Sequence, residues 1–149
     1  MSEGIGLSGQ GKMDFEDQLI LDAIKARKKS YSPYSKFAVG AAVRVSAEET
    51  KVFTGCNIEN ASYGLTICAE RTAIFSAVSQ GFRGIEAIAI VAAGDMPYPC
   101  GACRQVLSEF AVNPQIPVYV AKIDEEGEIL LREDYTLEEL LPKGFMLSE

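Results

Sequence analysis

Hydrophobic residues first recur at a helical spacing shortly after residue 12. Phe15, Leu19 and Ala23 lie four positions apart and Asp14 is a favoured N-cap residue, so the pattern predicts a helix that begins at about Asp14. Basic residues crowd the C-terminal half of this segment, where cations interact favourably with the helix dipole. Residues 1–12 contain four glycines and two serines and show no such period, so we expect a flexible tail there.

Two strand-like segments follow and predict a hairpin. Phe37–Val45 and Lys51–Cys56 are rich in strand-forming residues and are separated by a polar loop over Ala47–Thr50. The helical period then returns over Thr66–Gln80. The short apolar run Ile85–Ala92 predicts a buried strand.

The last third of the chain predicts four more elements. Gly101–Phe110 follows a proline-containing turn and is expected to be a helix. Pro117–Ile123 predicts a strand, and Glu128–Leu131 a second, short one. Thr136–Glu139 has the sequence of a capping box, which predicts the start of a last short helix.

The order of these elements is helix, hairpin, helix, strand, helix, strand, strand, helix. Strands that alternate with helices in the middle of the chain imply crossovers and at least one parallel pair of strands. We therefore expect an α/β fold with three layers, α/β/α, in which helices cover both faces of a mixed five-stranded sheet. The 149-residue chain shows no repeat or linker after residue 12, which predicts one domain over 13–149.

The charge and hydropathy of the chain narrow its partners. The net charge is −7 and the pI about 4.7, and an acidic surface repels phosphate backbones, so we expect no nucleic-acid partner. No apolar run approaches the roughly 20 residues of a membrane span, and the N-terminal residues lack the features of a signal peptide. We therefore expect a cytoplasmic protein without a membrane partner, in which the four cysteines are metal ligands or buried thiols.

The candidate chemistry lies in two motifs, Cys68-Ala-Glu70 and Pro99-Cys100-Gly-Ala-Cys103, in a chain that contains no histidine. Cys100 and Cys103 share one face of a predicted helix start, and Cys68 opens the other central helix, so three sulfurs can converge on one cation. The positive end of a helix dipole stabilises thiolates. The pattern predicts a tetrahedral zinc site with three protein ligands and an open position for water.

The pattern alone leaves other interpretations open. A C-x-x-C pair also occurs in redox dithiols, although that leaves Cys68-Ala-Glu70 without a role. All four cysteines would make a closed structural zinc site; otherwise Cys56 is a small buried hydrophobe. Glu70 is either an ordinary glutamate in a first helical turn or the proton carrier that a hydrolytic zinc site requires.

One of two arginines beside the motifs is expected to balance the charge of the site. Three thiolates on a divalent cation leave a net negative centre, which weakens its Lewis acidity. A donor to the sulfurs offsets that charge. We assign this role to Arg71, with Arg104 as the alternative, and a surface side chain is the simpler interpretation of either.

The two motifs, written in full as Cys68–Ala73 and Pro99–Val106, resemble those of the zinc-dependent cytidine deaminases, in the small homotetrameric branch with three cysteine ligands. The resemblance runs from residue 31 to residue 145 and includes three further segments: Tyr34–Ala42, Gly55–Ala61 and Leu140–Phe145. It implies a cytidine deaminase-like fold and one Zn²⁺ per subunit on the three motif cysteines. It also implies hydrolytic deamination of cytidine and 2′-deoxycytidine to uridine and 2′-deoxyuridine with release of ammonia, a reaction of pyrimidine salvage.

The resemblance further implies roles for individual residues. Glu70 would shuttle protons during the reaction. Asn57 and Glu59 would hold the ribose hydroxyl. The remaining substrate positions are Phe37 beside the pyrimidine, backbone groups near Ala69 at the base edge, and Ala61, Tyr63 and Phe145, which would reach a neighbouring subunit's site in a homotetramer.

Two rival functions stay open at this point. One is a deaminase with another substrate, such as a nucleoside antibiotic or single-stranded nucleic acid. Asn57 and Glu59 favour a free ribose or deoxyribose, and the acidic charge disfavours polynucleotides. The other is a non-enzymatic, zinc-stabilised binding module, which requires four protein ligands and leaves Glu70 without a role.

Overall fold

The computed structural model describes residues 13–147, so the tail expected over residues 1–12 lies outside the described residues. The elements appear in the predicted order, with one short 3-10 helix in addition. Their bounds are α1 Phe15–Arg27, β1 Val39–Val45, β2 Lys51–Cys56, η1 Tyr63–Leu65, α2 Ala69–Ser79, β3 Ile85–Ala93, α3 Gly101–Phe110, β4 Pro117–Ile123, β5 Ile129–Thr136 and α4 Leu137–Leu140. Within residues 13–147 no helix combines the length and apolar character needed to cross a membrane.

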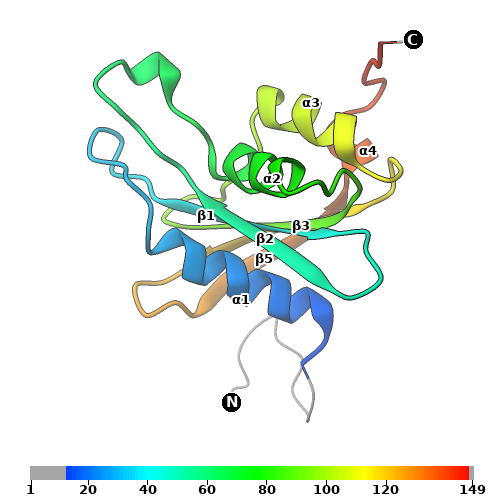
Figure 1. Ribbon diagram of the computed structural model, residues 1–149. Helices are drawn as coiled ribbons and strands as arrows, with labels where there is room; N and C mark the ends of the chain where they lie inside the picture. Colours follow the sequence, from blue (N-terminus) through cyan, green and yellow to red (C-terminus); the bar gives the residue numbers. More distant parts are fainter. Residues whose placement is uncertain (1–12, 148–149) are drawn as a thin grey trace.

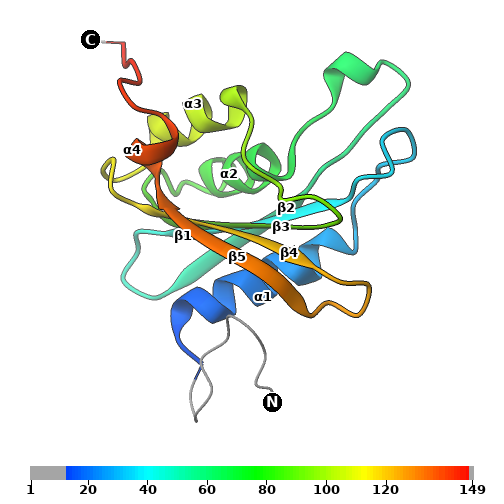
Figure 2. The same ribbon diagram turned by 180° about the vertical axis from the view of Figure 1, so that it is seen from behind.

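One five-stranded sheet runs through the middle of the molecule in the order β2-β1-β3-β4-β5. Strands β3 and β4 are parallel, whereas the other neighbouring strands are antiparallel. Helix α1 covers one face of the sheet, and α2 and α3 lie together over the other face, as seen from opposite sides (Figure 1, Figure 2). The predicted three-layer α/β/α fold with a mixed sheet is therefore confirmed.

Alternate residues of the central strands supply two hydrophobic cores, one on each face of the sheet. On β3, Ile88 and Ile90 belong to the core beneath α2 and α3, whereas Ala87 and Ala89 belong to the core beneath α1. The smaller side chains on the α1 side allow that helix to lie close to the sheet. Burial of both faces explains why β3 appears in the sequence as a continuous apolar run.

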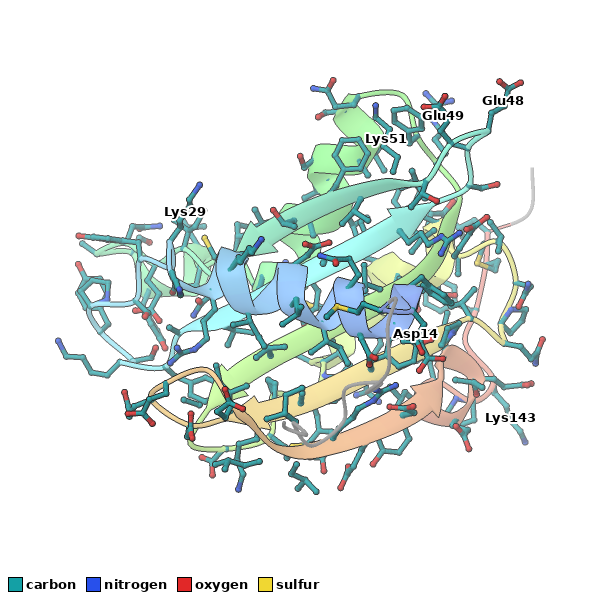
Figure 3. All side chains as sticks on the ribbon, turned by 90° about the horizontal axis from the view of Figure 1, so that it is seen from below. Asp14, Lys29, Glu48, Glu49, Lys51 and Lys143 are labelled. Atoms are coloured by element: carbon teal, nitrogen blue, oxygen red, sulfur yellow. The ribbon has the colours of Figure 1, made fainter. Side chains whose placement is uncertain are left out.

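Helix α1 begins and ends with groups that suit its dipole. The Asp14 side chain accepts a hydrogen bond from the backbone N–H of Asp17 at 3.0 Å, as expected of an N-cap residue. Lys25 and Arg27 lie in the last turn. Figure 3 shows α1 lying along the sheet, with Asp14 near one end and Lys29 near the other.

Two glycines allow helices to approach the hairpin from opposite faces. A Cβ atom on Gly40 of β1 would lie 2.1 Å from the backbone oxygen of Ala23 in α1. A Cβ atom on Gly55 of β2 would lie 2.5 Å from the backbone nitrogen of Ala73 in α2. Interiors packed this tightly accept a side chain at either position only if a helix moves. Gly55 therefore sets how closely the start of α2 approaches the sheet.

Several boundaries differ from those predicted, two of them by three residues or more. Strand β5 covers Ile129–Thr136 rather than ending at Leu131, because charged residues on this edge strand interrupt the apolar alternation while the backbone still pairs with β4. Helix α2 begins at Ala69 rather than at Thr66, because the chain just before it forms a β-bridge with the segment after β2.

Candidate functional site

Two helices on the same face of the sheet each have a cysteine as the N-cap residue. Cys68 precedes α2 and Cys100 precedes α3, both with an extended backbone (φ −72°, ψ 155° and φ −70°, ψ 169°). Cys103 is buried in the first turn of α3, and its backbone N–H donates to Cys100 Sγ at 3.4 Å. The three sulfurs therefore lie at the positive ends of two helix dipoles, which stabilises their thiolate forms.

The three sulfurs are spaced as ligands of one tetrahedral ion. They lie within 4.8 Å of one another, with 3.9 Å between Cys68 and Cys100 and 3.4 Å between Cys100 and Cys103. Sulfurs held about 2.3 Å from a tetrahedral zinc ion are about 3.8 Å apart, so the donor set fits zinc. Among the described residues Cys56 is not part of this group, which argues against the closed four-cysteine site.

Glu70 is the buried carboxyl group of the site. It is the second residue of α2, is only 5% exposed, and lines the same cavity as Cys68 and Cys100. Burial raises the pKa of Glu70 to about 7, an effect that Cys68 reinforces and Arg71 opposes. A carboxyl group with a pKa near neutrality can both accept and donate a proton at physiological pH. Such burial is unlike that of an ordinary glutamate on the surface of a first helical turn.

The two arginines beside the motifs have different partners. Arg71 Nη2 donates to Cys68 Sγ at 3.4 Å, whereas Arg104 Nη1 donates to the backbone carbonyl of Leu140 at 2.5 Å. Hydrogen bonds from Cys103 and Arg71 lower the pKa of Cys68 to about 5. The geometry therefore places the charge of Arg71, not that of Arg104, against the sulfur of Cys68.

A cavity of about 230 Å³ opens beside the sulfurs. Its volume is below the usual range of about 300–1,000 Å³ for ligand pockets, which suits a small ligand. The segments before β1 and after β2 project together at this end of the molecule (Figure 1, Figure 2). Five of the predicted substrate residues line the cavity: Phe37, Asn57, Glu59, Tyr63 and Ala69.

Asn57 joins the loop segments that form the cavity. Its side-chain oxygen accepts hydrogen bonds from the backbone N–H of Val39 at 2.9 Å and the hydroxyl of Ser30 at 2.5 Å. Its amide nitrogen donates to the backbone carbonyl of Phe37 at 2.8 Å. The Asn57 side chain thus hydrogen-bonds to the backbone of Phe37 and of Val39. Strand β1 begins at Val39 rather than at the predicted Phe37. One amide hydrogen of Asn57 is left over for a ligand.

Glu59 is a buried carboxylate, only 2% exposed. Its Oε1 accepts the backbone N–H groups of Tyr34 at 3.0 Å and Ser35 at 3.1 Å, and its Oε2 accepts the Ser35 hydroxyl. Burial alone would raise the pKa of Glu59, but these hydrogen bonds outweigh burial and lower it. Glu59 is therefore an ionised acceptor at neutral pH in the wall of the cavity, and its Oε2 can accept further hydrogen bonds besides that from Ser35.

Two predicted substrate residues lie outside the cavity of their own chain. Ala61 and Phe145 are exposed, Phe145 to 64%, and neither contributes to the cavity wall. Tyr63, by contrast, lines the cavity and meets Tyr34 edge to face, with 6.1 Å between ring centroids.

Sequence reasoning does not identify five residues of the cavity wall: Ser35, Val39, Thr66, Pro97 and Tyr98. Pro97 and Tyr98 come directly before the Pro99–Cys103 motif, and that proximity is the signal that could have indicated them. A larger cavity of about 420 Å³ lies between α3, α4 and the C-terminal segment, but it is lined by none of the three clustered cysteines.

A three-layer α/β/α domain with three thiols at two helix starts and a buried carboxyl group beside them has the architecture of a zinc-dependent deaminase. Sequence comparison agrees with this class. The chain belongs to the family described as the cytidine and deoxycytidylate deaminase zinc-binding region, which matches residues 13–119.

Individual relatives extend this similarity over most of the chain. The protein is 50% identical over 134 residues to a cytidine deaminase of Sporosarcina psychrophila, which covers 89% of this chain and 92% of that protein. The crystal structure of a cytidine deaminase from Burkholderia pseudomallei is 44% identical with a TM-score of 0.76, covering 89% of this chain and 100% of that one. A cytidine deaminase structure from Mycobacterium tuberculosis is 36% identical with a TM-score of 0.70, covering 90% and 99%. The expected family and fold are therefore confirmed.

Proposed function

We propose that this protein hydrolyses cytidine and 2′-deoxycytidine to uridine and 2′-deoxyuridine and releases ammonia. The observation that carries this proposal is Glu70, a buried carboxyl group with a pKa of about 7 beside three thiols at two helix starts. A non-enzymatic zinc module would have no use for such a group. The names of the relatives support the same substrate class.

The three clustered sulfurs, from Cys68, Cys100 and Cys103, would hold one zinc ion per subunit. Zinc held there would supply a Lewis acid, which makes water a nucleophile near neutral pH. We assign proton transfer to Glu70. Its carboxyl oxygen would take one proton from the attacking water and give it to the ring nitrogen next to the amine-bearing carbon. It would then take the remaining proton of the added oxygen and pass it to the amine, which leaves as ammonia while that oxygen becomes the carbonyl oxygen of the product. Arg71 would offset the negative charge of the thiolates.

The cavity wall would position the nucleoside. Phe37 would lie against the pyrimidine ring, and backbone groups near Ala69 would meet the edge of the base. Asn57 would donate its remaining amide hydrogen to the sugar, and Glu59 would accept from a sugar hydroxyl at Oε2. Since hydrogen bonds already hold both side chains, little conformational entropy would be lost on binding.

We further propose a homotetramer in the cytoplasm, acting in pyrimidine salvage, with each site at a subunit interface. Ala61, Tyr63 and Phe145 would approach the site of a neighbouring subunit. Exposed large hydrophobic side chains support an interface, among them Ile58, Leu65, Phe75, Met146 and Leu147. Sedimentation velocity should give four times the chain mass of 16.1 kDa, and a monomeric mass would contradict this assembly.

The deaminase activity is tested by following the absorbance change of cytidine with zinc-loaded protein and again after chelation. We expect turnover that chelation abolishes and zinc restores. Glu70→Gln should bind zinc normally but lose at least about 100-fold in kcat, the usual size of a general acid–base contribution. Glu49→Gln, at an exposed glutamate in the loop between β1 and β2, is the matched control and should be unaffected. Near-normal turnover by Glu70→Gln would remove Glu70 from the mechanism.

A further inference from the structure

A pair of tyrosines shares one carboxylate at the edge of the cavity. Tyr98 donates its hydroxyl to Glu133 Oε1 at 2.7 Å, and Tyr135 donates to the same oxygen at 2.5 Å. The two rings meet edge to face, with 6.3 Å between centroids and 67° between planes. Tyr98 lines the cavity, whereas Glu133 and Tyr135 belong to β5 and do not. This cluster therefore links the cavity wall to the edge strand of the sheet.

The loop that carries Tyr98 is held partly by packing, because Met96 contacts the core beneath α2 and α3 and Pro97 and Pro99 are buried. It spans residues 94–99, between the end of β3 and the N-cap of α3. Gly94 turns the chain with φ +92°, and the backbone N–H of Tyr98 donates to the carbonyl of Met96 at 3.0 Å within the loop. The bond to Glu133 is different, because it ties the loop to a strand 35 residues further along the chain.

We propose that Glu133 is a positioning residue that holds the Tyr98 ring as a wall of the substrate cavity and thereby sets the affinity for the nucleoside. The proposal rests on the proposed deaminase function. It adds a contact from β5, a strand to which that function assigns no residue.

The chemistry of the cluster supports this role. Hydrogen bonds from both phenols lower the pKa of Glu133, and the bond from Tyr135 has the larger effect. The carboxylate is therefore ionised at neutral pH. A charged acceptor makes each bond stronger than a neutral one. The Tyr98 side chain is 52% exposed, and a phenol ring without such an anchor would sample several rotamers.

A side chain in the cavity wall contacts the bound substrate and the transition state equally, so it stabilises both to the same extent. Loss of its position therefore raises KM and leaves kcat nearly unchanged. Either Tyr98→Phe or Glu133→Ala removes the bond and should raise KM for cytidine about three- to tenfold. This is less than the full effect of a buried charge-assisted bond, because Tyr98 is half exposed. The two changes remove the same bond, so the double variant should be no worse than either single variant.

The test measures KM and kcat for cytidine, zinc content and Tm for the wild type and each variant. Glu133→Gln keeps an acceptor oxygen and should recover part of the affinity lost in Glu133→Ala. Tyr135→Phe is the matched control, since it removes the other phenol from the same carboxylate outside the cavity. It should lower Tm at least as much as Tyr98→Phe while changing KM less than twofold.

The outcomes separate a positioning role from a structural one. A raised KM in Tyr98→Phe with normal kcat and zinc content, and an unchanged KM in Tyr135→Phe, support the proposal. Equal KM effects of the two phenylalanine variants, or a KM within twofold of the wild type in Tyr98→Phe, overturn it. A wild-type protein that does not deaminate cytidine overturns the proposed function itself and the inference with it.

Discussion

Gly55→Ala would press a methyl group into the start of α2. The added Cβ atom would lie 2.5 Å from the Ala73 nitrogen, 2.8 Å from the Thr72 Cβ atom and 2.9 Å from the Ala69 carbonyl oxygen. Two of these three atoms belong to the helix backbone and cannot rotate away. Since carbon contacts prefer about 3.5–4.0 Å, relief requires α2 to move about 1 Å from the sheet.

Gly55→Ala should lower the free energy of unfolding by an amount near the upper end of the range for overpacked cores. Such insertions cost about 1–3 kcal/mol, and contact with helix backbone leads us to expect about 2–3 kcal/mol for Gly55→Ala. For a chain of this size that corresponds to a decrease in Tm of about 4–12 °C. Movement of α2 also shifts Cys68 relative to Cys100 and Cys103, so zinc affinity should fall about tenfold or more, the usual effect of misplacing supported ligands.

The assay combines urea unfolding followed by circular dichroism, with and without excess zinc, and a zinc competition titration against a chromophoric chelator. Gly40→Ala is one control, because its clash is with α1 on the opposite face of the sheet. It should destabilise the protein without a specific loss of zinc affinity in the folded state. Gly64→Ala is the second, because its Cβ meets nothing within 4 Å, and it should be nearly neutral. A Gly55→Ala protein within about 0.5 kcal/mol of the wild type, the scatter of neutral surface changes, would refute the reasoning.

Three further predictions concern stability, acid sensitivity and metal binding. Arg132→Ala should lower the free energy of unfolding in urea by about 2–3 kcal/mol, between the values for surface and buried ion pairs. The reason is that Arg132 lies 3.4 Å from the buried carboxylate of Asp17. A loss below about 0.5 kcal/mol would contradict this prediction. The folded-state pKa of Glu59 lies below its ordinary value of 4.5, so its ionisation contributes stability that is complete above pH 4.5 and is lost as the pH falls through the folded-state pKa. The stability advantage of the wild type over Glu59→Gln should therefore shrink on acidification in urea titrations, and a constant difference would count against it. Cys103→Ala should lose zinc in atomic absorption, whereas Cys56→Ala, outside the cluster, should retain it; equal metal content would exclude Cys103 as a ligand.

The elements of this fold are largely predictable because most of their signals are local. A sheet buried on both faces leaves short apolar runs in the sequence, and amphipathic helices keep their period. Asp14 and the capping box at Thr136–Glu139 mark helix starts, and both caps are present in the structure. The three zinc-ligand candidates are also found locally, since each lies at or next to a predicted helix start.

The polar side chains that hold the site in place are different, because their partners lie far away along the chain. Asn57 bonds the backbone of Val39, 18 residues earlier, and Glu133 bonds Tyr98, 35 residues earlier. In the sequence each of them resembles an ordinary polar residue of a turn or an edge strand. The bonds of Asn57 accompany the late start of β1, and backbone pairing with β4 explains why β5 continues through charged residues that a periodicity argument takes for loop.

Substitutions in these two groups of residues should affect different kinetic constants. The residues to which we assign the chemistry lie at two helix starts, so replacing Glu70 should affect kcat. Asn57 and Glu133, which we propose to position the cavity wall, act through side-chain hydrogen bonds to the segments that line it. Replacing Asn57 or Glu133 should therefore loosen the wall and raise KM before it affects the metal or the proton transfer. Substrate preference among nucleosides would then change through these supporting residues, while the zinc site and its carboxyl group stay as they are.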